Sequence, residues 1–356
     1  MSKSVNTLIQ YYKFALKSTP KKPEKWKKND SAFENLRFKS YINYNGLAFC
    51  AFNSRNCGGN PVSFNLLVFV KQVPDTQNIS GDAMTPEGTV NRAALPAIFN
   101  PEDLNALELA LQLKDRYQAH VTVATMGMPA AAEVLRQSLY RGADRAVLVT
   151  DRALAGADTL ATSYTLSCVA KKLGNIDLVL CGRQAIDGDT AQVGPQIAEK
   201  LNIPQICYVE EVKSLEPGKI VARRAIEGGY EVLSSPLPAL LTVIDATDPR
   251  PMNVKLIMKY KRAGTPGEID GAAKKGEIAD PEKYKADLAA KGLLIEEYSA
   301  ADINAAPDRI GFPGSPTKVK QVMSVVLTAG EAKTVSADAE GIAGRMHELI
   351  SDHTLG

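Results

Sequence analysis

The sequence predicts an α/β fold with a doubly wound, mostly parallel sheet and a β-rich C-terminal arm. Apolar, strand-like runs alternate with helix-like stretches between residues 64 and 205, an order typical of a parallel sheet with helices on both faces. A loop with two glycines links one such run to the next helix at residues 181–195. After residue 204 the alternation stops and short strand-like segments follow one another.

Local signals define the elements of the alternating region. Residues 66–71 form a mainly apolar run, as expected for a strand covered on both faces. Asn100 and Pro101 predict a helix start, because Asn caps helices and Pro fits the first helical position. Asp158 predicts a second capped helix, which extends to residue 173. The remaining predicted elements are strands at residues 120–126, 146–150 and 177–181 and helices at residues 130–140 and 191–201.

The region after residue 204 predicts a different architecture. Residues 263–292 are rich in Ala, Gly, Lys and Glu, which indicates a solvated connection with one helix. A further helix is predicted at residues 253–262. The predicted strands of the arm lie at residues 206–212, 219–225, 230–233 and 239–244, with a turn at residues 228–229.

Composition excludes several classes of protein. Apolar residues make up 45% and charged residues 23% of the chain, which is ordinary for a globular protein. The net charge of +2 combines about +8 in residues 1–63 with about −6 in the rest, so nothing indicates a nucleic-acid-binding face on the main body. No apolar run reaches the ~20 residues of a membrane span. Five cysteines form no Cys-x-x-Cys pair, which favours buried thiols in a reducing compartment, and we expect the cytoplasm.

The basic segment 1–63 allows three interpretations. It is a targeting sequence, an added functional arm or a stretch outside the fold. It lacks the contiguous apolar core of a secretory signal, and it is not the Arg-rich, acid-poor sequence of a transit peptide. We favour a disordered extension outside the fold and assign it no function.

Residues 181–195, Cys-Gly-Arg-Gln-Ala-Ile-Asp-Gly-Asp-Thr-Ala-Gln-Val-Gly-Pro, carry the strongest site signal. Between a strand and a helix, unpaired backbone N–H groups and the helix dipole favour a bound phosphate. Gly182 and Gly188 allow turns and a close approach to a ligand. The spacing is neither G-x-G-x-x-G nor a Walker loop.

The two aspartates of this loop require an explanation, because a carboxylate would repel a bound phosphate. Asp187 and Asp189 could bind a metal, accept backbone N–H bonds as caps or turn formers, or contact ribose hydroxyls. No His or third carboxylate stands nearby in the sequence, so metal binding is the least favoured role. Thr190 and the backbone of residues 182–193 are the better phosphate donors.

Hydrolytic chemistry finds no support. His120 begins an apolar strand, while His347 and His353 are too far apart in phase to share one helix face. The chain contains neither H-E-x-x-H nor G-x-S-x-G. Arg92 and Arg183 are cationic candidates near phosphate, although a lone Arg is more often a solvated surface group.

The loop and four further segments together resemble the β subunit of electron transfer flavoproteins. The resemblance covers roughly residues 64–260 and continues more weakly to residues 314–320. It implies the family's doubly wound fold, of the adenine nucleotide hydrolase-like kind. The four segments are residues 70–76, 100–108, 141–144 and 157–162.

The resemblance also implies a set of nucleotide contacts. Phe69 and Met126 equally suit a core position, and Asn100 equally suits a helix cap, but strand ends and helix starts are where a doubly wound sheet opens its crevice. The implied cofactor-binding residues are Phe69, Asn100, Pro101, Glu102, Asp103, Met126, Gly182, Arg183, Gln184, Ala185, Ile186, Asp187, Gly188, Asp189, Thr190, Ala191, Gln192 and Val193. No catalytic residue and no metal ligand is assigned.

In this family the β subunit pairs with an α subunit that carries a redox-active FAD. Ordinary β subunits bind AMP structurally. Bifurcating ones bind a second FAD, which takes electrons from NADH and divides them between a high-potential acceptor of the acyl-CoA dehydrogenase type and a low-potential ferredoxin or flavodoxin. Residues 73–76, 189–195 and 314–320 resemble the bifurcating members, so we expect FAD, with AMP as the alternative.

The resemblance divides the chain and shows one departure from the family. We expect an extension at residues 1–63, a nucleotide-binding domain at 64–205, a β-rich, partner-wrapping arm at 206–262 and a C-terminal extension at 263–356.

Residues 243–250 correspond to the loop that docks the acceptor enzyme, but they are one residue shorter and lack its leucine. An acceptor other than an acyl-CoA dehydrogenase therefore stays open. The β-rich arm argues against a standalone regulatory module that binds an adenine nucleotide.

Overall fold

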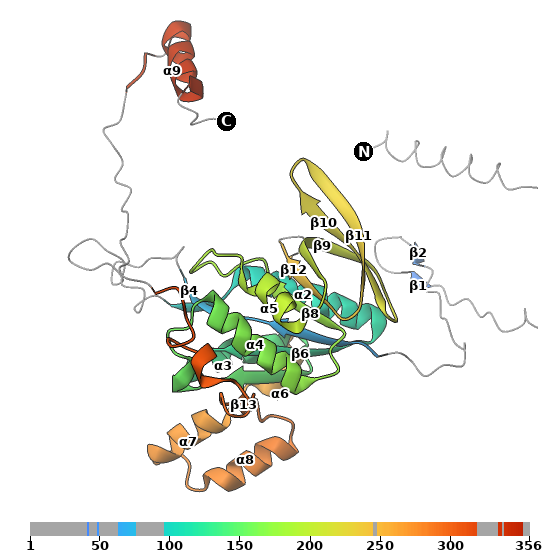
Figure 1. Ribbon diagram of the computed structural model, residues 1–356, viewed down its shortest axis with the longest axis vertical. Coiled ribbons are helices and arrows are strands. Elements are labelled where there is room, and N and C mark those ends of the chain that lie inside the picture. The colour runs from blue at the N-terminus through green and yellow to red at the C-terminus, as the bar shows by residue number, and fades with distance from the viewer. Residues whose placement is uncertain are drawn as a thin grey trace, which may run out of the picture. The chain divides into compact units, whose positions relative to one another are not determined.

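The computed structural model describes residues 41–42, 48–49, 63–75, 96–244, 248–318, 334–336 and 338–351 (Figure 1). The chain divides into two compact units, Met1–Asn60 and Pro61–Gly356. In the first unit, the described residues form the short antiparallel pair β1 (Tyr41–Ile42) and β2 (Ala48–Phe49). All other described elements belong to the second unit.

A nine-stranded sheet, in the order β11-β10-β9-β12-β8-β3-β6-β7-β13, forms the centre of the second unit. Its inner strands are mutually parallel, which confirms the predicted doubly wound, mostly parallel sheet. They are β3 (Asn65–Phe69), β6 (His120–Met126), β7 (Arg145–Val149), β8 (Leu178–Gly182) and β12 (Ala239–Val243).

The strand order reverses beside β3. From β3 the chain builds outward through β6 and β7, then returns to the other side of β3 and builds outward through β8 and β12. The connections after β3 and β8 therefore leave the same edge of the sheet in opposite directions. This topological switch point between β3 and β8 is where open α/β sheets bind ligands.

Helices cover both faces of the sheet. In β3, Leu66 and Val68 enter the core beneath α2 (Pro101–Tyr117) and α3 (Ala132–Arg141). The alternate side chains enter the core on the other face, beneath α4 (Thr159–Leu173) and α5 (Val193–Leu201), which lie side by side (Figure 1). This burial on both faces explains the continuous apolar character of the strand.

Capping residues set the helix boundaries close to the predicted positions. Asp158 caps α4, with its carboxylate accepting the N–H groups of Leu160 and Ala161. α3 ends at Gly142, whose φ of 119° suits glycine. The predicted helix 191–201 begins two residues later, at Val193. Short 3₁₀ helices are η3 (Pro129–Ala131), η4 (Arg152–Leu154) and η5 (Pro307–Arg309).

The predicted β-rich arm continues the same sheet. β9 (Gln205–Glu216) lies parallel to β12, and β10 (Lys219–Ile226) and β11 (Gly229–Pro236) follow it antiparallel. Gly228 makes the β10–β11 turn with a φ of 75°. A separate antiparallel pair, β4 (Gln72–Pro74) and β5 (Ala97–Phe99), lies outside the main sheet.

The C-terminal region is more structured than the sequence predicts. The predicted helix is present as α6 (Val254–Tyr260). The expectation of one helix at residues 263–292 is wrong, because α7 (Pro266–Lys274) and α8 (Pro281–Ala290) both form and pack together. Their starts carry side-chain caps at Thr265 and Asp280, each followed by proline.

A ninth strand, β13 (Glu296–Tyr298), adds to the sheet edge beside β7 and was not predicted. Three residues are too few to show a strand period. The carboxylate of Glu296 lies 2.6 Å from Arg145 on β7, which fixes the new strand to its neighbour. The last described helix is α9 (Ala339–Ser351).

Several predicted features lie outside the described residues. They include most of the segment 1–63, Arg92, His353, the middle of the docking segment at residues 245–247 and the end of the motif 314–320. Among the described helices, none has the length and apolar character needed to cross a membrane. Cys168 and Cys181 are buried as expected, whereas Cys207 is partly exposed.

Candidate functional site

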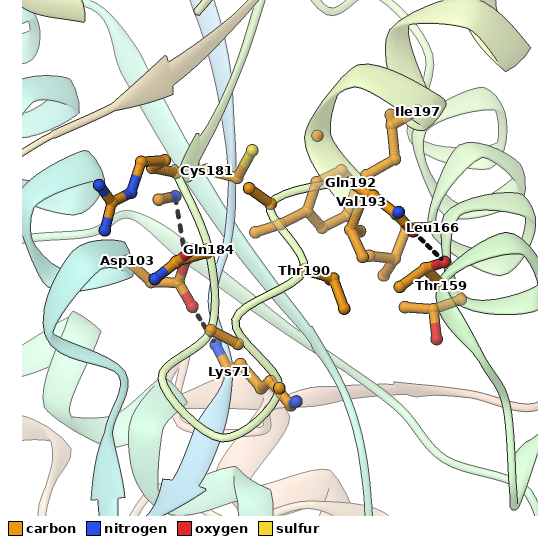
Figure 2. A pocket seen from close by; sticks show the side chains of 18 of the residues that line it. Lys71, Asp103, Thr159, Leu166, Cys181, Gln184, Thr190, Gln192, Val193 and Ile197 are labelled. Carbon is orange, nitrogen blue, oxygen red and sulfur yellow. Dashed lines mark hydrogen bonds between the residues drawn. The ribbon is translucent and has the colours of Figure 1, made fainter. Parts of the chain in front are cut away.

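A cavity of about 350 Å³ opens at the carboxyl ends of β3 and β8, at the topological switch point. The end of β6, the start of α4, the loop after β8 and the start of α5 complete its wall. Figure 2 shows Asp103, Gln184 and Cys181 on one side, Thr159, Leu166 and Ile197 on the other, and Thr190 between them. The position and size are those of a small-molecule site in an open α/β sheet.

The structure brings most of the sequence-predicted site residues together around this cavity. Five of them, Asn100, Pro101, Glu102, Ile186 and Asp189, do not line it. Those that line it are Phe69, Asp103, Met126, Gly182, Arg183, Gln184, Ala185, Asp187, Gly188, Thr190, Ala191, Gln192 and Val193.

Sequence reasoning missed part of the wall. One missed group follows β7 at the start of α4, and another, Val70 and Lys71, follows β3. The order of strands and helices contained this signal, because every connection after a parallel strand leaves from the same edge of the sheet. The missed lining residues are Val70, Lys71, Ala157, Asp158, Thr159, Thr162, Leu166, Cys181, Gly194 and Ile197.

Asn100 holds the loop instead of capping α2 with its side chain. The residue occupies the N-cap position, but its side chain makes no capping bond, so that part of the cap prediction is wrong. Its Nδ2 donates to the Gln184 carbonyl at 2.9 Å, and its Oδ1 accepts the Ile186 N–H at 3.2 Å. Because Asn100 is fully buried, these bonds fix the loop backbone to the start of α2.

Glu102 and Asp103 extend this attachment. Glu102 accepts from the Arg183 guanidinium at 2.6 Å and from the Gln184 N–H at 3.1 Å. Asp103 accepts the backbone N–H groups of Gly182 and Lys71, both at 2.9 Å. We name Asn100, Glu102 and Asp103 the α2 clamp. It joins the ends of β3 and β8 to one helix.

Burial raises the pKa of Asp103 to about 7, and the hydrogen bonds that it accepts partly offset this rise. Removal from water disfavours a charged carboxylate, whereas N–H donors favour it. Burial likewise raises the pKa of the Cys181 thiol, which lies in the wall of the cavity. Cys181 is therefore a neutral packing group and not an activated nucleophile.

Glycine is required where the loop meets the α2 clamp. A Cβ added to Gly182 would lie 2.6 Å from the Glu102 carbonyl carbon and 2.7 Å from the Asp103 nitrogen. A Cβ on Gly194 would lie 2.7 Å from the Thr242 methyl group. At Gly188, by contrast, nothing lies within 4 Å of the added atom.

The second half of the loop is open. Asp189 and Ala191 adopt φ values of 47° and 52°, which non-glycine residues rarely do. Such strain gathers at functional sites, and alternating backbone conformations can point successive N–H groups at an anion. The first N–H groups of α5, which lack intrahelical partners, follow directly. Exposed Thr190 lies in this open half and lines the cavity.

The two loop aspartates have side-chain partners. Asp187 forms an ion pair with Lys71 at 2.7 Å, and Asp189 accepts from Gln184 Nε2 at 2.9 Å. Neither carboxylate accepts a backbone N–H in the part of the chain that the structure describes, so the cap or turn-former role is wrong. Within those residues, no group of three His, Cys, Asp or Glu side chains could hold a metal ion.

Comparison with known proteins identifies the class to which this fold and cavity belong. The electron transfer flavoprotein domain matches residues 87–279. The chain is 46% identical over 292 residues to the electron transfer flavoprotein subunit beta of Clostridium acetobutylicum, covering 82% of this chain and 100% of that protein. The chain belongs to the electron transfer flavoprotein family, as a β subunit.

Two further relatives have names that refer to CoA-ester reductases. Subunit CarD of the caffeyl-CoA reductase-Etf complex of Acetobacterium woodii is 41% identical, over 81% of this chain and 98% of that protein. The acryloyl-CoA reductase electron transfer subunit gamma of Anaerotignum propionicum is 38% identical, over 82% of this chain and 99% of that protein.

The function of the chain is therefore electron transfer, in a family that is associated with flavins and nucleotides. A β subunit implies an α-subunit partner and an electron acceptor. The cavity fits a nucleotide, because its wall combines the start of α5, a strained polar loop and buried apolar groups such as Leu166 and Ile197.

Proposed function

We propose that this chain is the FAD-binding β subunit of a heterodimeric electron transfer flavoprotein that divides the electrons of NADH between two acceptors. One electron of each hydride goes towards a high-potential acceptor and the other towards a low-potential ferredoxin or flavodoxin. When bound, FAD supplies this chemistry, since it accepts electrons in pairs and releases them singly. The protein holds, orients and shields the flavin.

The open half of the loop is the observation that carries this proposal. Asp187, Gly188, Thr190, Ala191 and Gln192 line the cavity and are exposed or half-exposed, directly before the first turn of α5. A pyrophosphate needs a longer cradle than a single phosphate does. Thr190 and the N–H groups of residues 190–194 supply donors along such a path. The half-buried Met126 and the buried Phe69 add apolar surface to the cavity wall.

We further propose that the α subunit packs against the arm formed by β9, β10 and β11. Exposed apolar side chains on these strands, Tyr230 and Val232 among them, support an interface there. The free, unpaired cysteines of the described residues fit the cytoplasm as its location.

We propose a CoA-ester oxidoreductase of the acyl-CoA dehydrogenase type as the high-potential acceptor. The two relatives named for caffeyl-CoA and acryloyl-CoA reductases support this class. The short docking segment without its leucine (residues 243–250) favours an enzyme whose docking surface differs from that of an ordinary acyl-CoA dehydrogenase.

The second candidate is an ordinary β subunit that binds AMP structurally, while the α-subunit FAD carries the electrons. The size of the cavity favours it. At about 350 Å³, it lies near the lower end of the roughly 300–1,000 Å³ range of ligand pockets. A mononucleotide needs less room than a flavin dinucleotide.

Purification of the chain with its α subunit, followed by a nucleotide count, separates the two candidates. The proposal expects two FAD per heterodimer, bleaching of the flavin spectrum by NADH, and reduction of ferredoxin only when the high-potential acceptor is also present. One FAD with one AMP, and no response to NADH, would contradict it and support the ordinary β subunit.

A further inference from the structure

An ion pair joins the end of β3 to the open half of the loop. The Lys71 ammonium lies 2.7 Å from both carboxylate oxygens of Asp187. The backbone of Lys71 is fixed, because its N–H donates to Asp103 and its carbonyl accepts the Asn100 N–H at 2.9 Å. The Lys71 side chain is 47% exposed and lines the cavity. The Lys71 backbone is therefore held in place, while its exposed ammonium group can exchange Asp187 for another partner.

The other charges of the cavity wall are already committed, as far as the structure describes it. Arg183 is held by Glu102 of the α2 clamp. Asp103 accepts two backbone N–H groups. Asp158 accepts the N–H groups at the start of α4 and that of Thr317. Lys71 differs from Arg183, the other cation in the described cavity wall. Its side chain pairs with Asp187 in the open half of the loop and not with the α2 clamp.

A nucleotide phosphate can compete for this ammonium. Exposed ion pairs contribute little net stability, because water already solvates both charges. The phosphate of AMP, or the pyrophosphate of FAD as a whole, carries more charge than one carboxylate and offers several acceptor oxygens, and lysine binds such a group as a point charge. Such a phosphate at the start of α5 would also gain from the helix dipole.

We propose that Lys71 is a phosphate-binding residue of this cavity and that Asp187 competes with the nucleotide phosphate for its ammonium. The inference rests on the proposed function only in that a nucleotide occupies the cavity. It holds for the phosphate of AMP and for the pyrophosphate of FAD alike. A nucleotide count that finds AMP would overturn the proposed function and leave this inference standing.

The test uses Lys71→Gln and Asp187→Asn in the full heterodimer with the α subunit. Affinities for AMP and for FAD are measured on the nucleotide-stripped protein. Lys71→Gln should weaken binding about 10- to 100-fold, as expected for the loss of a charge-assisted bond. Asp187→Asn should tighten it by up to about fivefold, because the competing carboxylate is gone. Lys71→Arg should stay within a few fold of the unaltered protein.

The opposite signs of the two effects separate this role from a structural one. If the ion pair only stabilises the loop, both variants weaken binding, and that result overturns the proposal. An unchanged affinity in Lys71→Gln also overturns it. If Lys71→Gln fails to fold, Asp187→Asn and Lys71→Arg still test the proposal. Weaker nucleotide binding in Asp187→Asn would contradict the proposed competition.

Discussion

The two halves of the loop after β8 differ in what holds them. Residues 182–186 are fixed by the α2 clamp, whose buried or half-buried side chains hydrogen-bond to the loop backbone. Residues 187–192 are exposed or half-exposed, and they have two strained backbone positions and partners that are themselves partly exposed. Acidic residues beside a phosphate site can therefore belong to the scaffold, as Glu102 and Asp103 do. Both halves line the cavity, but only the half without that scaffold is exposed and leads into the start of α5.

Substitution of the two glycines tests this difference most strongly. Gly182→Ala should destabilise the protein by about 2–3 kcal/mol, because the new methyl group meets backbone atoms of α2 that cannot yield. Gly188→Ala, the matched control, should change stability by less than about 0.5 kcal/mol. Denaturant unfolding of both variants measures the change in stability. Equal losses would show that the two halves of the loop do not differ in how tightly they are held.

Asp103→Asn should rank second. The Asn amide can accept only one of the two N–H groups that Asp103 accepts and turns its NH₂ towards the other. An unsatisfied buried donor costs about 1–3 kcal/mol. The free energy of unfolding should fall by that amount, with a weaker retention of nucleotide.

The pH dependence of this effect has a definite sign. The pKa of Asp103 is about 7 in the folded protein against 3.8 ordinarily, so the folded state binds the proton more tightly. Stability from this group is therefore greatest at low pH and declines as pH rises from about 4 to 7. The loss caused by Asp103→Asn should be larger at pH 5 than at pH 8. A loss that grows with pH would contradict this assignment.

Asn100→Ala should have a smaller effect, about 1–2 kcal/mol, since it leaves the Gln184 carbonyl and the Ile186 N–H without their partner. Hydrogen exchange should show faster exchange at Ile186. Exchange at Thr190 in the open half should not change. A uniform increase along the loop would mean that the two halves move as one.

Ser315→Ala should have the smallest effect, about 1 kcal/mol. Ser315 Oγ is buried, accepts the Asp158 N–H at 2.8 Å and donates to the Gly311 carbonyl at 2.6 Å. The substitution loosens the α4 wall opposite the α2 clamp, so nucleotide release should quicken slightly. Stopped-flow release rates measure this, with exposed Ser351→Ala as the control.

Sequence patterns predicted the alternating core well, because strands covered on both faces and capped helices carry strong local signals. Asp158 and Gly142 are such cases. β13 and the second helix at residues 263–292 were missed, since a three-residue strand has no period and polar helices lack an apolar stripe.

The candidate site was predicted in position but not in the roles of its side chains. The loop itself and its convergence with β3 and β6 follow from strand order. The α2 clamp could not be predicted, because its contacts join residues about 80 positions apart, such as Asn100 and Gln184. The partnership of Lys71 with Asp187 spans a still longer separation in sequence.

Counting FAD in the Thr190→Glu heterodimer tests most directly whether this cavity holds the second flavin. A carboxylate in the open half would repel a pyrophosphate at the start of α5. We predict two FAD in the unaltered heterodimer and in Thr190→Ser, but one in Thr190→Glu, with loss of reduction by NADH. Two FAD in Thr190→Glu, or one FAD with one AMP in the unaltered protein, would contradict it.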